Sequence, residues 1–292
     1  MLSLLLMLLL GKAIPILKSQ QLPTPTDIFI LAGQSNMAGR GGVIGNITWD
    51  GIVPPQCQSN PSILRLSAEL KWVLAQEPLH ADIDYNKTNG IGPGMAFANA
   101  ILTKEPTIGA VGLVPCAIGG TNISQWAKGG FLYEQLIRRT KAAEKSGGVV
   151  RAMLWYQGES DTIFEEDADA YKERLIKFFK EIRVDLNHHR LRIIQVGLAS
   201  GEGAFVEEIR KAQLGIKVKN VESVDAKGLP LGPDRLHLTT PAQVHLGQML
   251  ADKFLHSPSM FSIHTTTDSS LSTKIYDNHL LFILLMSFFL SF

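Results

Sequence analysis

The sequence predicts an α/β protein, a three-layer sandwich in which helices cover both faces of a parallel sheet of roughly five strands. Short and nearly continuous apolar runs alternate along the chain with longer segments of helical periodicity. Runs without an in-and-out alternation are typical of strands that are buried on both faces, and strands that alternate with helices form parallel sheets. The 292 residues, 45% hydrophobic and 19% charged, are enough for one sizeable core.

The expected elements follow one another in a regular order. Strands are expected at 28–32, 111–115, 152–156, 191–197 and 221–225. Helices are expected near 62–70, 95–103, 133–145, 167–185, 204–217 and 241–254. The segment 41–94 is rich in Pro, Gly and Asn, so we expect it to be largely irregular and to supply loops around a substrate pocket.

Charge and composition narrow the function classes. The 28 basic and 27 acidic residues are well mixed and leave a formal net charge of +1, which argues against nucleic acid as a partner. The eight histidines show no ligand spacing with cysteines or carboxylates, so we expect no metal and no cofactor. Cys57 and Cys116 are the two cysteines, and we leave them unpaired.

A candidate nucleophile follows the first apolar run. The run ends at Gly33-Gln34-Ser35-Asn36, a pattern that predicts a tight turn from a strand into a helix. A serine there presents its hydroxyl at the carboxyl edge of the sheet and keeps its N–H near a helix N-terminus, as a nucleophile requires. By itself, the same serine also fits an ordinary turn.

A candidate base lies about two hundred residues further along, in Asp234-Arg235-Leu236-His237. An Asp and a His three residues apart on one turn project to the same side, so the carboxylate orients the imidazole while the other ring nitrogen faces a serine. Taken alone, the pair also fits surface or capping groups. Together with Ser35 it predicts acyl-transfer chemistry.

Two further segments follow apolar runs and contain possible oxyanion donors, 118–126 with its glycine pair and 157–161 with Gln157 at its start. Charge that develops on a carbonyl oxygen needs N–H donors already in place, and a glycine backbone or a glutamine amide supplies them. The alternative is that the glycines allow close packing and that Gln157 satisfies a loop backbone. Glu159 and Asp161 are too close in one loop to flank a glycosidic bond, and we expect them to brace the site.

The blocks GQSNMAGRGG, GIGPGMAFA, LVPCAIGGTNISQW, LWYQGESD and DRLHLT, in this order, carry a family resemblance. Over residues 27–255 the chain resembles the plant carbohydrate esterases of the SGNH hydrolase superfamily, the group that shares the sialate O-acetylesterase domain and carbohydrate esterase family six. The resemblance implies that Ser35 is the nucleophile, His237 the general base and Asp234 its orienting acid.

It also implies oxyanion donors from the Ser35 backbone, Gly120 and Gln157, although the choice between Gly119 and Gly120 stays open. Gln157 stands where many members of the superfamily carry asparagine. We expect four residues near these blocks to contact the substrate: Gln34, Asn36, Trp126 and Glu159. For Trp126, and for Trp155 and Tyr156 nearby, a place in the core is the alternative to stacking on a sugar.

The expected function is that of a serine esterase that removes O-acetyl groups from carbohydrates through an acyl-enzyme. The specificity for acetyl groups and for carbohydrates is inferred from the resemblance alone. The Ser, Asp and His pattern equally fits a lipase, a thioesterase or a peptidase of the same fold, and a catalytically silent carbohydrate-binding surface protein is the alternative from another class.

The two ends of the chain predict an extracellular location. Residues 1–13 read as a signal peptide and 14–26 as a linker, followed by the esterase domain at 27–257. A polar linker at 258–279 precedes a hydrophobic tail at 280–292, which fits a GPI attachment signal better than a membrane-spanning helix. A chance extension or a retained short anchor is the alternative. The oligomeric state stays open.

Overall fold

The computed structural model describes residues 22–256. The predicted signal peptide, the polar linker and the hydrophobic tail lie outside the described residues. Within them, no helix is both long and apolar enough to cross a membrane.

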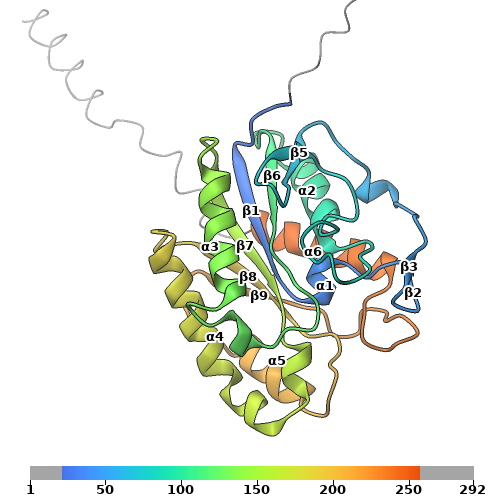
Figure 1. Cartoon of the computed structure of the whole chain (residues 1–292), viewed down its shortest axis with the longest axis vertical. Helices are drawn as coiled ribbons and strands as arrows, with labels where there is room; N and C mark the ends of the chain where they lie inside the picture. Colours follow the sequence, from blue (N-terminus) through green and yellow to red (C-terminus); the bar gives the residue numbers. More distant parts are fainter. Residues whose placement is uncertain (1–21, 257–292) are drawn as a thin grey trace, which may run out of the picture.

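A seven-stranded sheet forms the centre of the fold, in the order β5-β4-β6-β1-β7-β8-β9 (Figure 1). All neighbouring strands pair in parallel except β5, which runs antiparallel to β4 at one edge. The strands are β1 (Asp27–Gly33), β4 (Ile63–Leu66), β5 (Trp72–Leu74), β6 (Val111–Pro115), β7 (Val149–Tyr156), β8 (Arg192–Gly197) and β9 (Val221–Asp225). A separate two-stranded hairpin consists of β2 (Val43–Ile44) and β3 (Thr48–Trp49).

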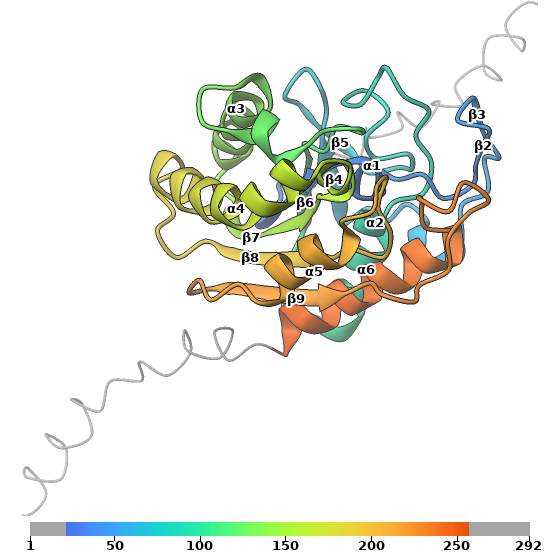
Figure 2. The same ribbon diagram turned by 90° about the horizontal axis from the view of Figure 1, so that it is seen from below.

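Helices cover both faces of the sheet, as the sequence predicts (Figure 2). The helices α2 (Pro93–Lys104) and α6 (Thr240–Leu255) pack together on one face. The other face carries α3 (Phe131–Glu144), α4 (Glu165–Asp185) and α5 (Val206–Leu214). The short elements are α1 (Ser35–Ala38), η1 (Pro55–Cys57), η2 (Ile123–Trp126) and η3 (Glu159–Thr162).

Aromatic side chains fill the core on each face. Phe29 of β1 packs edge to face on Phe97 and Phe254, which join β1 to α2 and α6. On the other face, Trp155 of β7 packs against Trp126 and against Phe178 of α4. Because these rings are almost completely buried, the carboxyl ends of β1 and β7 are held in fixed positions relative to the helices.

The predicted helix at 62–70 is wrong. Its first half forms β4, in which Ile63, Leu64 and Leu66 are buried, and β4 pairs in parallel with β6. The apolar spacing of this segment fits either a helix or a strand, and the free edge of β6 selects the strand. With β5, this edge adds two strands to the roughly five expected.

Both cysteines are free and buried, Cys57 in η1 and Cys116 directly after β6. Burial raises the pKa of the Cys116 thiol to about 11, so this side chain is a neutral part of the core.

Candidate active site

The turn after β1 is fixed by a close approach to β7. Gly33 has a φ of +133°, and a Cβ atom on it would lie 2.0 Å from the carbonyl oxygen of Tyr156. The N–H of Gln34 donates to the same oxygen at 2.8 Å. Only glycine fits this close contact. The turn makes Ser35 the first residue of α1, at the carboxyl edge of the sheet.

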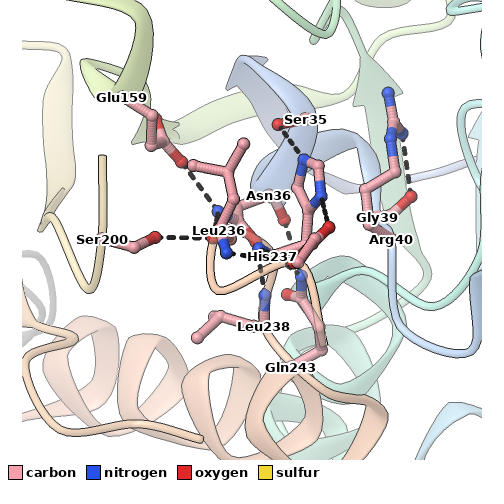
Figure 3. A network of polar contacts seen from close by, with 11 residues as sticks. Ser35, Asn36, Gly39, Arg40, Glu159, Ser200, Leu236, His237, Leu238 and Gln243 are labelled. Atoms are coloured by element: carbon pink, nitrogen blue, oxygen red, sulfur yellow. Dashed lines mark hydrogen bonds and ion pairs between the residues drawn. The ribbon is translucent and has the colours of Figure 1, made fainter. Parts of the chain in front are cut away.

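Ser35, His237 and Asp234 form a hydrogen-bonded series, and Figure 3 shows the contact between Ser35 and His237. His237 Nε2 is 2.9 Å from Ser35 Oγ, and His237 Nδ1 is 2.6 Å from Asp234 Oδ2. The loop after β9 carries the pair, and Asp234 Oδ1 accepts the N–H groups of Leu236 and His237 at 3.0 Å. The structure therefore brings the three residues together as the sequence pattern requires.

The surroundings suit the imidazole to act as a base. Burial lowers the pKa of His237 below the ordinary 6.5, although the Asp234 carboxylate acts in the opposite direction. Burial alone would raise the pKa of Asp234, but the N–H groups of His237 and Leu236 hold it below its ordinary value. At neutral pH the pair is thus an uncharged imidazole beside an ionised carboxylate.

Asn36 ties the nucleophile turn to the histidine loop (Figure 3). Its Oδ1 accepts the N–H of Leu238 at 2.9 Å, and its Nδ2 donates to the carbonyl of Leu236 at 3.3 Å. The same Nδ2 donates to Glu159 Oε1 at 2.8 Å. Gln243 of α6 donates to the Asn36 carbonyl at 3.1 Å. One buried side chain thereby holds the backbone on both sides of His237.

The carboxyl group of Glu159 is buried in this network. Burial raises its pKa to about 7, because desolvation outweighs the hydrogen bond from Asn36. Its second oxygen has no hydrogen-bond partner among the described residues. Glu159 is therefore partly protonated near neutral pH.

Backbone donors for an oxyanion lie beside Ser35. A Cβ atom on Gly119 would lie 3.4 Å from the Ser35 Cβ, and Gly119 and Gly120 both line the pocket over Ser35. Gly120 has a φ of +73°, a conformation that favours glycine. Among the described residues, the N–H groups of both glycines have no acceptor in the protein. Both remain candidates, together with the Ser35 N–H.

Gln157 does not have the position expected of an oxyanion donor. Its side chain is fully buried and is absent from the pocket lining. Its Nε2 donates to the carbonyl of Thr121 at 2.9 Å, to Asp161 at 2.5 Å and to Gln34 at 3.3 Å. The amide protons are used inside the protein, so Gln157 joins the end of β7 to the loop after β6 and is not directed at a ligand.

The four expected substrate contacts are also buried. Trp126 is 0% exposed and donates its indole N–H to Thr121, so the core alternative holds for this ring. The other three side chains, Gln34, Asn36 and Glu159, are each 0% exposed. Asn36 donates to Glu159, and Gln34 accepts the N–H of Gly158 in the same loop as Glu159. Polar residues beside a nucleophile resemble ligand contacts in a sequence, but here they hold the loops that carry the reacting groups.

The irregular segment before α2 supplies five of the twelve residues that line the pocket. The pocket over Ser35 and His237 has a volume of about 570 Å³. The segment 41–94 supplies Asn46, Tyr85, Asn86, Lys87 and Thr88, as its composition predicts. No local pattern in the sequence marks these individual residues.

Arg40 and Glu202 also line the pocket. Arg40 is buried and pairs with Asp84 at 2.5 Å. Its positive charge contributes to the lowered pKa of His237. Within residues 22–256, no group of three or more His, Cys, Asp or Glu side chains is arranged to hold a metal ion.

Comparisons with known proteins show the family of the chain. Residues 25–256 match the family model described as carbohydrate esterase, sialic acid-specific acetylesterase. The chain is 55% identical over 237 residues to the probable carbohydrate esterase At4g34215 of Arabidopsis thaliana, and the match covers 79% of this chain and 91% of that protein.

Solved structures resemble the fold. The crystal structure of the Arabidopsis protein has a TM-score of 0.77 and 53% identity, covering 79% of this chain and 98% of that one. The structure of NanS has a TM-score of 0.63 at 16% identity, covering 80% and 97%. A carbohydrate acetylesterase from Xanthomonas citri has a TM-score of 0.56 at 18% identity, covering 78% and 56%. The last two likenesses concern the fold alone.

Proposed function

Since the chain belongs to the carbohydrate esterase family of sialic acid-specific acetylesterases, and is thus a hydrolase of ester bonds, we propose that it removes O-acetyl groups from carbohydrates through an acyl-enzyme on Ser35. The observation that carries the proposal is the hydrogen-bonded series from Ser35 through His237 to Asp234, which lies below an open pocket.

In the first half of the reaction, Ser35 Oγ attacks the acetyl carbonyl carbon while His237 Nε2 takes the hydroxyl proton. Asp234 stabilises the imidazolium that forms and keeps Nδ1 as the other donor. The negative oxygen of the tetrahedral intermediate accepts the N–H groups of Ser35 and of Gly119 or Gly120. The intermediate then collapses, the C–O bond to the sugar breaks, and His237 gives its proton to the leaving sugar hydroxyl.

In the second half, water takes the place of the sugar. His237 accepts a proton from the water as its oxygen attacks the acetyl-serine carbonyl, and the same backbone N–H groups hold the oxyanion. Collapse breaks the bond to Ser35 Oγ, His237 returns the proton to Ser35, and acetate leaves. The lowered pKa of His237 supports this role because the free base is present at neutral pH.

The character of the pocket favours a hydroxylated leaving group over a lipid. Polar residues line the space over Ser35: Arg40, Asn46, Asn86, Lys87, Thr88 and Glu202. A site for a long acyl chain is predominantly apolar, whereas a sugar requires donors and acceptors around it.

The test is acetate release from acetylated xylan, pectin and mannan, together with p-nitrophenyl esters of increasing acyl length. We expect release from at least one polysaccharide and a preference for acetyl over octanoyl esters. A preference for octanoyl esters would indicate a lipase, and no turnover of any ester would indicate a silent binding protein. Ser35→Ala is the control and is expected to abolish release.

We also propose that the protein is secreted and held at the cell surface. The proposal is based on the sequence at 1–13 and at 268–292. Phosphatidylinositol-specific phospholipase is expected to release the full chain from expressing plant cells, and a form that ends at Thr267 is expected in the medium without treatment. Retention on membranes after the treatment would contradict the lipid anchor, and a full chain that stays in the cytosol would contradict secretion.

A further inference from the structure

A second groove adjoins the pocket over Ser35. It has a volume of about 730 Å³ and runs between the loop at 82–87 and the N-terminal end of α3. Tyr85, Asn86, Lys87 and Gly119 line both spaces. Because a Cβ atom on Gly119 would lie 3.4 Å from the Ser35 Cβ, the groove begins beside the nucleophile.

Two exposed aromatic rings belong to this groove. In the described residues, three aromatic side chains are exposed: Tyr85, Phe131 and Phe164. Tyr85 is 75% exposed and Phe131 is 73% exposed, and both line the groove although they are far apart in the sequence. Exposed aromatic rings that gather along one concave surface indicate a binding site, whereas isolated ones do not.

Three of the charged side chains in the groove, Asp82, Asp84 and Arg139, are held by internal partners. Asp84 pairs with the buried Arg40, and Asp82 pairs with Arg65 at 2.6 Å. The guanidinium of Arg139 donates to three backbone carbonyls, at 2.7 to 3.0 Å. These side chains are thus held in place, and the two carboxylates are neutralised by arginines within the protein.

Polar side chains accompany the rings. The groove is also lined by Gln135, which belongs to α3 as Phe131 does, and by Ser124 and Gln125 of η2, which packs against α3. A pyranose ring has apolar C–H faces that pack on aromatic rings and hydroxyl groups around its edge that require hydrogen-bonding partners. The groove lining is mostly apolar, with two exposed rings and with amides among them, and this combination matches that pattern.

We propose that this groove binds the sugar residues next to the acetylated one, so that the substrate class is an acetylated oligosaccharide or polysaccharide and not a single acetylated sugar. The proposal rests on the esterase function proposed above. Binding of the neighbouring sugars positions the acetyl ester over Ser35, with Tyr85 and Phe131 as the stacking surfaces.

The experiment measures kcat/KM for acetate release from acetylated xylan, mannan and pectin fragments of increasing length, from single sugars upward, with p-nitrophenyl acetate as the short reference ester. For at least one polymer, kcat/KM is expected to rise by about tenfold or more with length. The ratio to compare is kcat/KM for the oligosaccharide divided by kcat/KM for p-nitrophenyl acetate. Tyr85→Ala and Phe131→Ala are each expected to lower this ratio by about tenfold. Phe164→Ala is the matched control, an exposed aromatic outside the groove, and is expected to preserve the ratio.

Three outcomes would overturn the inference. One is a kcat/KM that does not change with length for any of the three polymers. Another is a ratio that both groove variants leave at its original value. The third is faster hydrolysis of p-nitrophenyl octanoate than of the acetate, with that preference lost in Phe131→Ala, which would assign the groove to an acyl chain. Hydrolysis of p-nitrophenyl acetate together with either of the first two outcomes leaves the proposed acetylesterase function intact. The third outcome would indicate a lipase instead, and a protein that does not hydrolyse p-nitrophenyl acetate would refute both proposals.

Discussion

Removal of the Asn36 side chain is expected to cost both stability and turnover. Asn36→Ala leaves the N–H of Leu238 and the Glu159 carboxyl without their partner in a buried region. The carbonyl of Leu236 keeps the Ser200 hydroxyl as a donor. Each orphaned buried group costs roughly 1–3 kcal/mol, so the free energy of unfolding is expected to fall by about 4 kcal/mol.

The effect on turnover follows from the position of His237 between the two backbone groups that Asn36 holds. A loosened loop no longer keeps Nε2 at 2.9 Å from the Ser35 hydroxyl. A displacement of about 1 Å is enough to lower kcat by about a hundredfold. KM is expected to change little, because Asn36 is buried and does not line the pocket.

Asn36→Asp separates the role of the hydrogen bonds from that of the shape. This variant keeps the acceptor for Leu238 but faces the Glu159 carboxyl with a second carboxyl group. Because the pKa of Glu159 is raised to about 7, its proton is available at pH 5 to bridge the two groups. As the pH rises from 5 to 8 this proton is increasingly lost and the two groups repel each other as carboxylates, so the variant is expected to lose more stability and more activity at pH 8 than at pH 5.

The assay is urea unfolding at pH 5 and pH 8 with kcat and KM measured on p-nitrophenyl acetate. Ser200→Ala is the matched control, since it removes one hydrogen bond to Leu236 and leaves the Asn36 contacts in place. The reasoning is refuted if Asn36→Ala destabilises no more than Ser200→Ala, if it raises KM alone, or if Asn36→Asp shows the same loss at both pH values.

Four further outcomes are expected. Ser35→Ala and His237→Ala should each lower kcat by several orders of magnitude, with the double variant hardly worse than either, and additive losses in initial-rate measurements would contradict a joint role. Asp234→Asn should lower kcat by up to about ten-thousandfold, and a variant close to wild type would remove Asp234 from the mechanism. The acid limb of the pH profile of kcat/KM should report a pKa below the ordinary 6.5, because burial lowers the pKa of His237 and its protonated form is inactive; a limb above that value would contradict this. Gln157→Ala should lower the free energy of unfolding by about 2 kcal/mol because Thr121 and Asp161 lose their donor, and a stable variant with only kcat lowered would restore the oxyanion role expected from the sequence.

The parts of the fold that the sequence predicts are those in which local pattern and burial agree. β1 and β6 are apolar runs that end in sharp turns, and they lie where expected. The sequence predicts a helix where β4 lies, because the apolar spacing of this segment fits both a helical and a strand period. Only the pairing with β6 decides between the two. β5 has three half-buried residues, which is too short a run to give a signal.

The residues of the site also differ in how well the sequence predicts them. Ser35 and His237 stand in motifs whose residue types and order predict their chemistry, and the structure brings them together. The sequence does not distinguish an oxyanion donor at Gln157 from a buried structural amide, since both have the same identity and place in a sequence; the hydrogen bonds of the amide favour the structural role. No sequence motif marks Tyr85 or Phe131, because their exposure in one groove depends on how distant segments of the chain meet.

The acyl-enzyme on Ser35 is the central claim, and peptide mass spectrometry after rapid acid quench tests it most directly. During turnover of p-nitrophenyl acetate, the peptide that contains Ser35 is expected to gain the mass of one acetyl group and to lose it again once the ester is exhausted, while Ser35→Ala shows neither the acetyl group nor turnover. An acetyl group on another residue that forms and decays at the rate of turnover, or a Ser35→Ala variant that still hydrolyses the ester at the wild-type rate, would contradict the account.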